Sequence, residues 1–281
     1  MGKNNIFDFG NKTYIMGILN VTPDSFSDGG KFLSLDNAVK HAIEMEKEGA
    51  YIIDIGGEST RPGSKPVSID EEMNRVIPVI EELVNKIKIP LSIDTYKSDV
   101  AKKALDLGVS MVNDITALRH DKNLASLVAE YDAPICLMHM KGEPQNMQQN
   151  PIYDDVVKEI YDFLKERINY AISSSIKKEN IIIDPGLGFG KRTGCGIEDN
   201  SEIIHRLSEL KDLGCPILIG ASRKTFIGNM CGCKRPLPVN ERLGGSIAAA
   251  CTAVINGADI VRVHDVKETR QSLELVDKIV R

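Results

Sequence analysis

The segment from Ile181 to Gly190 limits the possible folds of this chain more than any other stretch. It opens with three consecutive isoleucines, which cannot alternate between core and solvent, so they predict a strand buried on both faces, as parallel strands are. The run stops at Asp184, and Pro185 and Gly186 then lead the backbone out of the sheet. The segment therefore predicts a parallel strand that carries a carboxylate at its carboxyl end.

Short apolar runs of the same kind recur along the chain and alternate with stretches of helical periodicity. They predict eight strands, at residues 14–19, 51–55, 91–94, 110–114, 134–138, 181–184, 216–220 and 260–263. A helix-like stretch follows each of them, and the longest covers residues 154–173.

Alternating strands and helices over 281 residues predict the α/β class and a single (β/α)₈ TIM-barrel domain over residues 1–281, since such barrels typically have about 250 residues. An open, doubly wound sheet would show fewer strands and a glycine fingerprint after the first one, and neither is present. Ahead of the first strand, Gly10 and Asn11 form a turn pair between short apolar segments. Residues 6–14 are therefore expected to form a short N-terminal hairpin.

Charge and cysteine content exclude several classes of function. The formal net charge of -5 argues against a nucleic-acid-binding surface, and no apolar run is long enough to cross a membrane. The six cysteines show neither a CxxC pair nor the histidine spacing of a zinc site, so we interpret them as reduced thiols of a cytoplasmic protein. A local basic cluster could still bind an anion.

Several predicted strands end at or beside an aspartate: Asp54, Asp94, Asp114 and Asp184. Each could simply cap the helix that follows, because Asp is a favoured N-cap residue. In a barrel, however, the carboxyl ends of the strands form the active-site face, where a shielded carboxylate can bind a flat heterocycle through paired N–H contacts. Asp184 is the strongest candidate, since Pro185 and three glycines separate it from the next helix.

Basic residues follow several of the strands: Arg61, Arg223, Lys224, Arg262 and His264. Scattered surface cations are the ordinary interpretation, but an arginine inside the apolar run 260–263 is costly unless it faces a polar centre. Loops after the last strands of this fold often hold phosphate, so the set predicts an anionic, phosphate-bearing substrate. Asn20 and Asp24 give a weaker indication of a metal site, and His139 is interpreted as a packed histidine.

Longer motifs give the chain a family resemblance. They are GILNVTPDSFSDGG at residues 17–30, GESTRPG at 57–63, SIDT at 92–95, VNDI at 112–115, DPGLGFGK at 184–191, ASRK at 221–224 and RVHD at 262–265. With these motifs, which span nearly the whole chain, the sequence closely resembles dihydropteroate synthase of folate biosynthesis.

The resemblance implies a cytoplasmic, homodimeric transferase that uses Mg²⁺. Such an enzyme joins 4-aminobenzoate to the methylene of 6-hydroxymethyl-7,8-dihydropterin pyrophosphate and releases 7,8-dihydropteroate and pyrophosphate. The implied partners are these small molecules, with no nucleic acid and no membrane.

The resemblance also gives each matching residue a role. Asp94, Asn113, Asp184 and Lys224 are expected to hold the pterin ring, and Asp94, Asp184 and Lys224 are the expected catalytic residues. Asn20 is expected to bind Mg²⁺, while Thr60, Arg262 and His264 are expected to contact the pyrophosphate. Asp28, Arg61, Pro62 and Thr225 are expected to shape the aminobenzoate pocket, with the loops after the first two strands closing over it.

Two departures from the family pattern and two competing functions remain open at this point. The link 192–199 is longer than the family's usual one, and Thr225 replaces the common serine, which adds a methyl group beside the aminobenzoate pocket. A related barrel transfers a methyl group from a methylated folate to a corrinoid protein, but it would not need the loops at 20–30 and 60–63. A non-catalytic pterin-binding barrel would have lost metal or pyrophosphate residues, and none is missing here.

Overall fold

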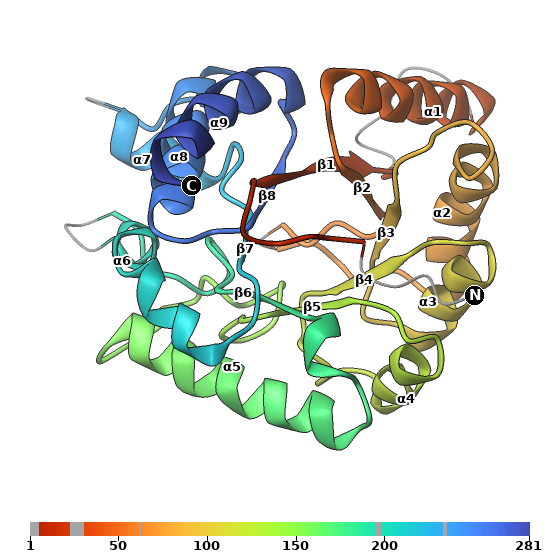
Figure 1. The fold of residues 1–281 in the computed structure, drawn as a ribbon, viewed down its shortest axis with the longest axis horizontal. Coiled ribbons are helices and arrows are strands. Elements are labelled where there is room, and N and C mark those ends of the chain that lie inside the picture. Colours follow the sequence, from red (N-terminus) through yellow and green to blue (C-terminus); the bar gives the residue numbers. More distant parts are fainter. Residues whose placement is uncertain (1–5, 23–30, 62, 195–197, 233–234) are drawn as a thin grey trace.

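A barrel of parallel strands surrounded by helices makes up the fold (Figure 1). The computed structural model describes residues 6–22, 31–61, 63–194, 198–232 and 235–281, with side chains described from Leu35 onward in α1. The strands are β1 (Tyr14–Asn20), β2 (Ile52–Gly56), β3 (Leu91–Asp94), β4 (Met111–Asp114), β5 (Ile135–Met138), β6 (Ile181–Asp184), β7 (Leu218–Ile219) and β8 (Ile260–Val263). The helices are α1 (Lys31–Glu48), α2 (Ile69–Leu83), α3 (Ser98–Asp106), α4 (Lys122–Glu130), α5 (Val156–Ser173), α6 (Asp199–His205), α7 (Thr225–Cys231), α8 (Leu243–Ile255) and α9 (Val266–Val280), with short 3₁₀ segments at Lys178–Asn180, Leu207–Leu213 and Val239–Glu241.

The sheet closes on itself between β6 and β7. Neighbouring strands in the order β6-β5-β4-β3-β2-β1-β8-β7 are paired in parallel. The two ends of this order meet at a parallel bridge between Ile183 and Ile217, where the Ile183 N–H donates to the Pro216 carbonyl at 2.9 Å. All carboxyl ends of the strands therefore lie at one end of the barrel, and the predicted (β/α)₈ fold is confirmed.

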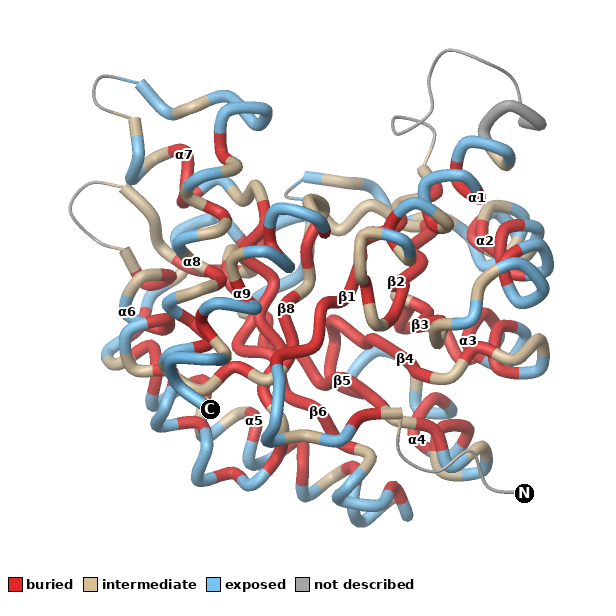
Figure 2. Tube along the Cα trace, turned by 45° about the horizontal axis from the view of Figure 1, so that its top comes forward, coloured by how far each residue is buried: buried red, intermediate tan, exposed pale blue. Residues whose placement is uncertain are grey.

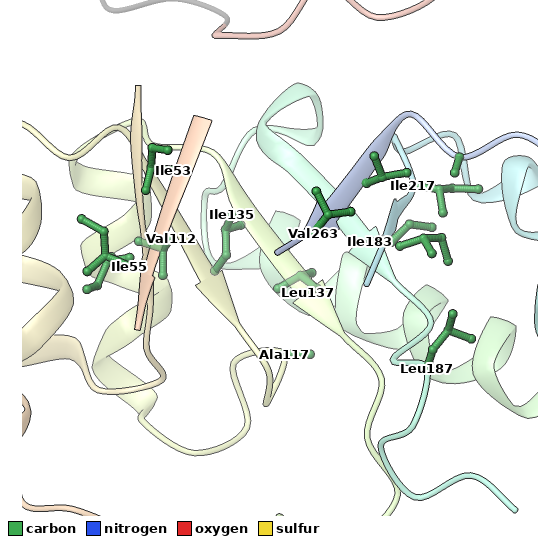
Figure 3. Close-up of a cluster of buried hydrophobic side chains, with 14 of the residues drawn as sticks. Ile53, Ile55, Val112, Ala117, Ile135, Leu137, Ile183, Leu187, Ile217 and Val263 are labelled. Carbon is green, nitrogen blue, oxygen red and sulfur yellow. The ribbon is translucent and has the colours of Figure 1, made fainter. Parts of the chain in front are cut away.

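Alternate side chains along the strands belong to two separate cores, because successive residues of a strand point to opposite faces. The residues that fill the barrel are Tyr14, Met16, Ile52, Met111, Cys136, Ile182, Leu218 and Ile260. The residues between them, such as Ile53, Val112 and Ile183, pack beneath the helices (Figure 3). Figure 2 shows the result, with buried strands inside a ring of helices whose outer faces are exposed.

The predicted strands each overlap an observed one, but the predicted N-terminal hairpin is wrong. Residues 6–13 contain turns and no strand. Phe7 and Phe9 instead pack edge-on against Tyr14, with ring centroids 5.0 and 5.5 Å from it. Because β1 already pairs with β2 on one side and β8 on the other, it has no free edge for an antiparallel partner. The N-terminal aromatic residues close the amino end of the barrel instead.

Candidate active site

The alternation of inward-facing and outward-facing side chains along each strand continues to the carboxyl end of the barrel, where the inward-facing residues are polar. They are Asn20, Asp54, Asp94, Asn113, Asp184 and Arg262. Asp54, for example, stands two residues beyond Ile52 of the barrel core. The strand register places Asp94 beside Asn113 and Gly56. Residues far apart in the sequence are thus gathered at one mouth.

Asp114 is the next residue after the inward-facing Asn113, so its side chain faces the other side of the strand, and it has a different role. Its Oδ1 accepts hydrogen bonds from the N–H and the hydroxyl of Thr116, both at 2.7 Å, and its Oδ2 accepts one from the Leu118 N–H at 2.6 Å. These bonds shape the turn after β4. Asp114 therefore has a structural role in this turn and does not cap α4, whose N-cap is Asp121.

Arg262 is the centre of the charged network in the mouth. Its Nε donates to Oδ2 of Asp54 at 2.6 Å, and its Nη2 donates to Oδ2 of Asp94 at 2.8 Å. Asn113 Nδ2 donates to the same oxygen of Asp54 at 2.9 Å. The sequence analysis noted Asp54 as an aspartate at the end of a predicted strand but gave it no role in the site. The available signal was Arg262 itself, because an inward guanidinium requires a counter-charge of the same parity.

Burial shifts the pKa values of Asp94, Asp184 and Lys224 toward neutral pH. It raises the pKa of Asp94 to about 7, with Arg262 acting in the opposite direction. It also raises the pKa of Asp184, which the cation of Lys224 lowers in turn. Burial lowers the pKa of Lys224 to about 8, against the attraction of Asp184. Such perturbed groups gathered in one place are typical of functional sites.

Asp184 is held at the end of β6 by a tight turn. Its Oδ1 accepts a hydrogen bond from the Gly186 N–H at 2.7 Å. Gly186 has a φ of 70°, and a Cβ there would lie only 1.9 Å from the carbonyl oxygen of His139, so the position requires glycine. One oxygen of Asp184 thus shapes the backbone, while the inward parity of the residue brings its carboxyl group into the mouth.

A buried lysine that the sequence analysis missed supports this turn. Lys191 has no exposed surface, and its Nζ lies 2.9 Å from the carbonyl oxygens of Gly186 and Phe189 and 3.0 Å from Nδ1 of His139. An ammonium has three protons, and these three acceptors use all of them. His139 is therefore a packed histidine, as predicted. Lys191 ends the DPGLGFGK motif, which was the available signal.

Lys224 reaches the same turn from the loop after β7. Its Nζ donates to the carbonyl of Leu187 and lies 4.5 Å from the centre of the Phe189 ring. Phe189 also borders a small apolar cluster, which consists of Tyr96, Ile115, Met138, Met140 and Met147. Charged groups beside apolar and aromatic surface suit a flat heterocycle that carries N–H donors.

His264 follows β8 and is fixed by Ser222. The Ser222 Oγ lies 3.0 Å from Nδ1 of His264 and accepts a hydrogen bond from its backbone N–H at 3.2 Å. Burial lowers the pKa of His264 to about 4, and the charges of Arg262 and Arg61 act in the same direction. The imidazole is therefore neutral at pH 7.

Asn20 ends β1 beside Gly56, its partner in the strand register. A Cβ added at Gly56 would lie 3.8 Å from Oδ1 of Asn20 and 3.5 Å from Cβ of Asp94. The amide of Asn20 and the carboxylate of Asp94 therefore approach the same small residue from neighbouring strands.

The remaining predicted residues lie around the rim of the mouth. Thr60 is half-buried and Arg61 exposed in the loop after β2, and Thr225 is exposed at the start of α7. Asp28 and Pro62 lie outside the described residues. Arg223 is engaged in an ion pair, since its Nε donates to Asp265 at 2.9 Å.

The extended link 192–199 is closed at its base. Arg192 pairs with the buried carboxylate of Asp199, with Nη2 2.8 Å from Oδ1 and Nε 3.0 Å from Oδ2. Directly after it, the Asn200 Oδ1 accepts a hydrogen bond from the Gly188 N–H at 2.7 Å. The extra residues thus leave the turn after β6 attached to α6.

The described residues include no helix that combines the length and apolar character needed to cross a membrane. They also contain no group of three or more His, Cys, Asp or Glu side chains placed to hold a metal ion.

Comparison with known proteins gives consistent matches over the full barrel. A family profile described as pterin binding enzyme matches residues 16–264. The dihydropteroate synthase of Clostridium beijerinckii is 48% identical over 276 residues, which cover 98% of this chain and 97% of that protein. The dihydropteroate synthase of Escherichia coli is 45% identical over 264 residues, which cover 94% and 90%.

Solved structures are similar over the same extent. A dihydropteroate synthase from Clostridium difficile, solved in the presence of pteroic acid, has a TM-score of 0.90 and 52% identity, and the match covers 98% of this chain and 99% of that one. The enzyme from Xanthomonas albilineans with 4-aminobenzoic acid has a TM-score of 0.88 and 44% identity, with coverage of 96% and 93%.

Proposed function

The chain belongs to the dihydropteroate synthase family of pterin-binding enzymes. On that premise, we propose which substrate groups bind to the inward-facing strand residues and which bind to the loops at the rim of the barrel. The enzyme condenses 6-hydroxymethyl-7,8-dihydropterin pyrophosphate with 4-aminobenzoate in folate biosynthesis. One observation supports the assignment of residues: polar side chains from separate strands all face inward at the same end of the barrel.

The pterin ring binds among the inward residues Asp94, Asn113 and Asp184, with Lys224 beside it. A dihydropterin presents neighbouring ring N–H and amino donors, which a carboxylate accepts as a pair. Asp184 is the carboxylate for this pair, because its neighbours Lys224 and Phe189 combine a cation with an aromatic face. Asn113 supplies a neutral amide, which can donate and accept at the same time.

The chemical step breaks the C–O bond between the methylene and the pyrophosphate and forms a bond from the amine nitrogen to the methylene carbon. Positive charge develops on the methylene and the electron-rich ring as the pyrophosphate leaves. The buried carboxylate of Asp184 and the largely shielded carboxylate of Asp94 stabilise this charge. The aromatic amine needs only to be positioned for attack, and after the bond forms its nitrogen gives up one proton, which the leaving pyrophosphate accepts.

The leaving pyrophosphate is received by Arg262, His264 and Thr60. The Ser222 hydroxyl accepts from the backbone N–H of His264 and lies 3.0 Å from Nδ1. In the proposed tautomer the hydroxyl donates to Nδ1, which places the ring proton of the neutral imidazole on Nε2, where it can be donated to a phosphate oxygen. Arg262 supplies the positive charge from the end of β8.

Mg²⁺ is proposed to bind at Asn20. This ion usually keeps several waters and takes one or two protein ligands together with substrate phosphates, so a single amide oxygen fits it better than a dedicated acidic cage would. When bound, the ion offsets the negative charge of the pyrophosphate. Replacing Asn20 with Ala should reduce activity sharply and weaken the tightening of pyrophosphate binding by Mg²⁺ in calorimetry. Full activity in the presence of a chelator would contradict the metal role.

The aminobenzoate pocket is assigned to the rim. Arg61 on the loop after β2 and Thr225 at the start of α7 are the described residues, and Asp28 and Pro62 complete the set. The extra methyl group of Thr225, relative to serine, narrows this pocket on one side.

We also propose that the enzyme is a cytoplasmic homodimer. The described cysteines are free thiols, as a reducing compartment requires. Ile255 is 58% exposed at the end of α8, and Met230 is 51% exposed on the adjacent α7, so apolar surface is available for a second copy. Light scattering of the protein and of Ile255→Asp tests the dimer.

One assay tests the assignment of the pterin residues. The protein is incubated with the pterin pyrophosphate, 4-aminobenzoate and Mg²⁺, and pyrophosphate and dihydropteroate are measured. Asn113→Ala should lose affinity for the pterin, whereas the surface variant Lys158→Ala should behave like the unchanged protein. Equal pterin affinity in both variants would overturn the assignment.

A further inference from the structure

One lysine fixes both ends of the loop after β2, residues 57–68. The Nζ of Lys97 donates to Oε2 of Glu58, at the start of the loop, at 2.6 Å. It donates at 2.8 Å to the carbonyl of Val67, near the end of the loop. A third bond of 2.6 Å runs to Oε2 of Glu72 in the first turns of α2. The three protons of the ammonium thus meet three acceptors from the loop and the helix that follows it.

The charge balance of this cluster makes Lys97 indispensable to it. One cation stands between two carboxylates, and the side chains of Lys97, Glu58 and Glu72 are only 10%, 8% and 1% exposed. Loss of the lysine would leave two shielded like charges facing each other, which is strongly unfavourable. Tyr96 completes the cluster by donating its hydroxyl to Oε1 of Glu58 at 2.6 Å.

The same segment joins the loop to the pterin site. Lys97 follows Asp94 by three residues at the end of β3. Between them, the Thr95 N–H donates to the Asn113 carbonyl at 3.1 Å, and the Lys97 N–H donates to Oγ1 of Thr95 at 3.3 Å. The connection between the two residues is therefore tied to β4 and cannot move independently of the pterin-binding strands.

The middle of the loop is attached differently from its ends. The Gly63 N–H donates at 3.1 Å to the carbonyl of Pro144, which belongs to the long connection after β5. Thr60 is half-buried and Arg61 exposed between the two points that Lys97 holds. The fixed ends determine where this exposed part stands above the mouth.

We propose that Lys97 is a positioning residue for 4-aminobenzoate, because it fixes the loop 57–68 at both ends against the strand that carries Asp94. The inference rests on the proposed role of this loop in forming the aminobenzoate pocket. Lys97 touches neither substrate and acts through Glu58 and Val67. A loop released from Lys97 must be ordered by the second substrate itself, so part of the binding free energy of that substrate is lost.

The test compares Lys97→Met with Lys102→Met, a control on α3 whose lysine is exposed and pairs with Asp106. Lys97→Met should raise the KM for 4-aminobenzoate by about tenfold or more, while the dissociation constant of 6-hydroxymethyl-7,8-dihydropterin, which lacks the pyrophosphate, stays unchanged. Lys102→Met should change neither value. If Lys97→Met does not fold, Glu58→Gln keeps the shape of the side chain, removes one charge and should shift the KM in the same direction.

Arg61→Ala separates this inference from the proposed function. If Arg61→Ala raises the KM for aminobenzoate and the Lys97 and Glu58 variants do not, Lys97 has no positioning role and the loop assignment stands. If none of them raises it, both the loop assignment and the inference fail. A loss of pterin binding in Lys97→Met equal to the rise in KM would also overturn the inference, because a general structural defect would then explain both.

Discussion

The Nε atom of Arg262 lies 2.6 Å from Oδ2 of Asp54, an aspartate with no exposed surface. The same oxygen accepts from the amide of Asn113, so one buried carboxylate orients the residues proposed to contact the pyrophosphate and the pterin from opposite sides of β2. Asp54 is absent from the motif-based assignment, yet it links Arg262 to Asn113, the residues proposed for the two parts of the first substrate.

Replacing Asp54 with Ala should destabilise the protein and disorganise the mouth. Breaking a buried ion pair typically costs about 3 kcal/mol or more, because the remaining charge is left without its partner. Asp54→Asn keeps one oxygen to accept from Arg262 and Asn113, but it removes the charge and replaces the other oxygen by an NH2 group, so its loss should be smaller than that of the alanine variant. Urea unfolding and pterin calorimetry of both variants measure this. An alanine variant as stable as the unchanged protein would show that Asp94 alone suffices for Arg262.

Pterin affinity should have a narrow pH optimum between about 7 and 8. The carboxyl group of Asp94, whose pKa is raised to about 7, loses its proton and gains its negative charge only as the pH rises through that value. The amine of Lys224, whose pKa is lowered to about 8, loses its charge above it. Calorimetry across pH should therefore show a bell-shaped profile, and Lys224→Arg should remove its alkaline limb. A flat profile from pH 6 to 9, a range of about one unit beyond each value, would contradict this.

Asp184→Asn should reduce pterin affinity without affecting stability. An amide oxygen can still accept the hydrogen bond of the Gly186 N–H, so the turn survives. Toward the pterin, however, the amide places a donor against a donor. The loss should be about 3 kcal/mol, or roughly a hundredfold in affinity or in kcat/KM. Calorimetry and thermal melting of the same sample are compared, and an unchanged affinity would refute the pterin contact.

Lys191→Met should alter the pH dependence of stability. Burial lowers the pKa of Lys191 to about 7, below its usual value of 10.5, so the folded protein releases this proton more readily than the unfolded chain. The contribution of Lys191 to the free energy of unfolding therefore rises with pH between about 7 and 10.5, by at most about 1.4 kcal/mol per pH unit. Urea unfolding at several pH values should show this rise, and the methionine variant should lack it. Parallel curves for both proteins would exclude the effect.

Much of this fold and site could be predicted from sequence, because the periodicity of the strands indicates both where the strands lie and which of their residues face inward. Apolar runs that end in a polar residue indicated the barrel, and counting residues by twos separates the inward Asn113 from the outward Asp114. Asp54 could have been found in the same way, since it stands two residues beyond the inward Ile52.

Neither the lack of a strand in residues 6–13 nor the Lys97 cluster could be predicted, for different physical reasons. Gly10 and Asn11 do indicate a turn, but whether strands pair across it depends on a free sheet edge, which a closed barrel does not leave. Lys97 is separated from Glu58 by 39 residues, and Glu72 looks like an ordinary acidic residue at a helix start. Only the folded chain brings these charges into contact.

The junction between β6 and β7 gives the barrel an uneven resistance to local opening. The described residues show one bridge there, Ile183 to Ile217, whereas β5 and β6 share a register of four pairs. Amide protons along this junction should exchange with solvent sooner than those of the other strands, because fewer bonds must break to release them. Asp184 stands on one side of it and Lys224 follows the strand on the other. A bound pterin that contacts both residues would link β6 to the loop after β7 across the junction with the fewest hydrogen bonds, and so slow this exchange.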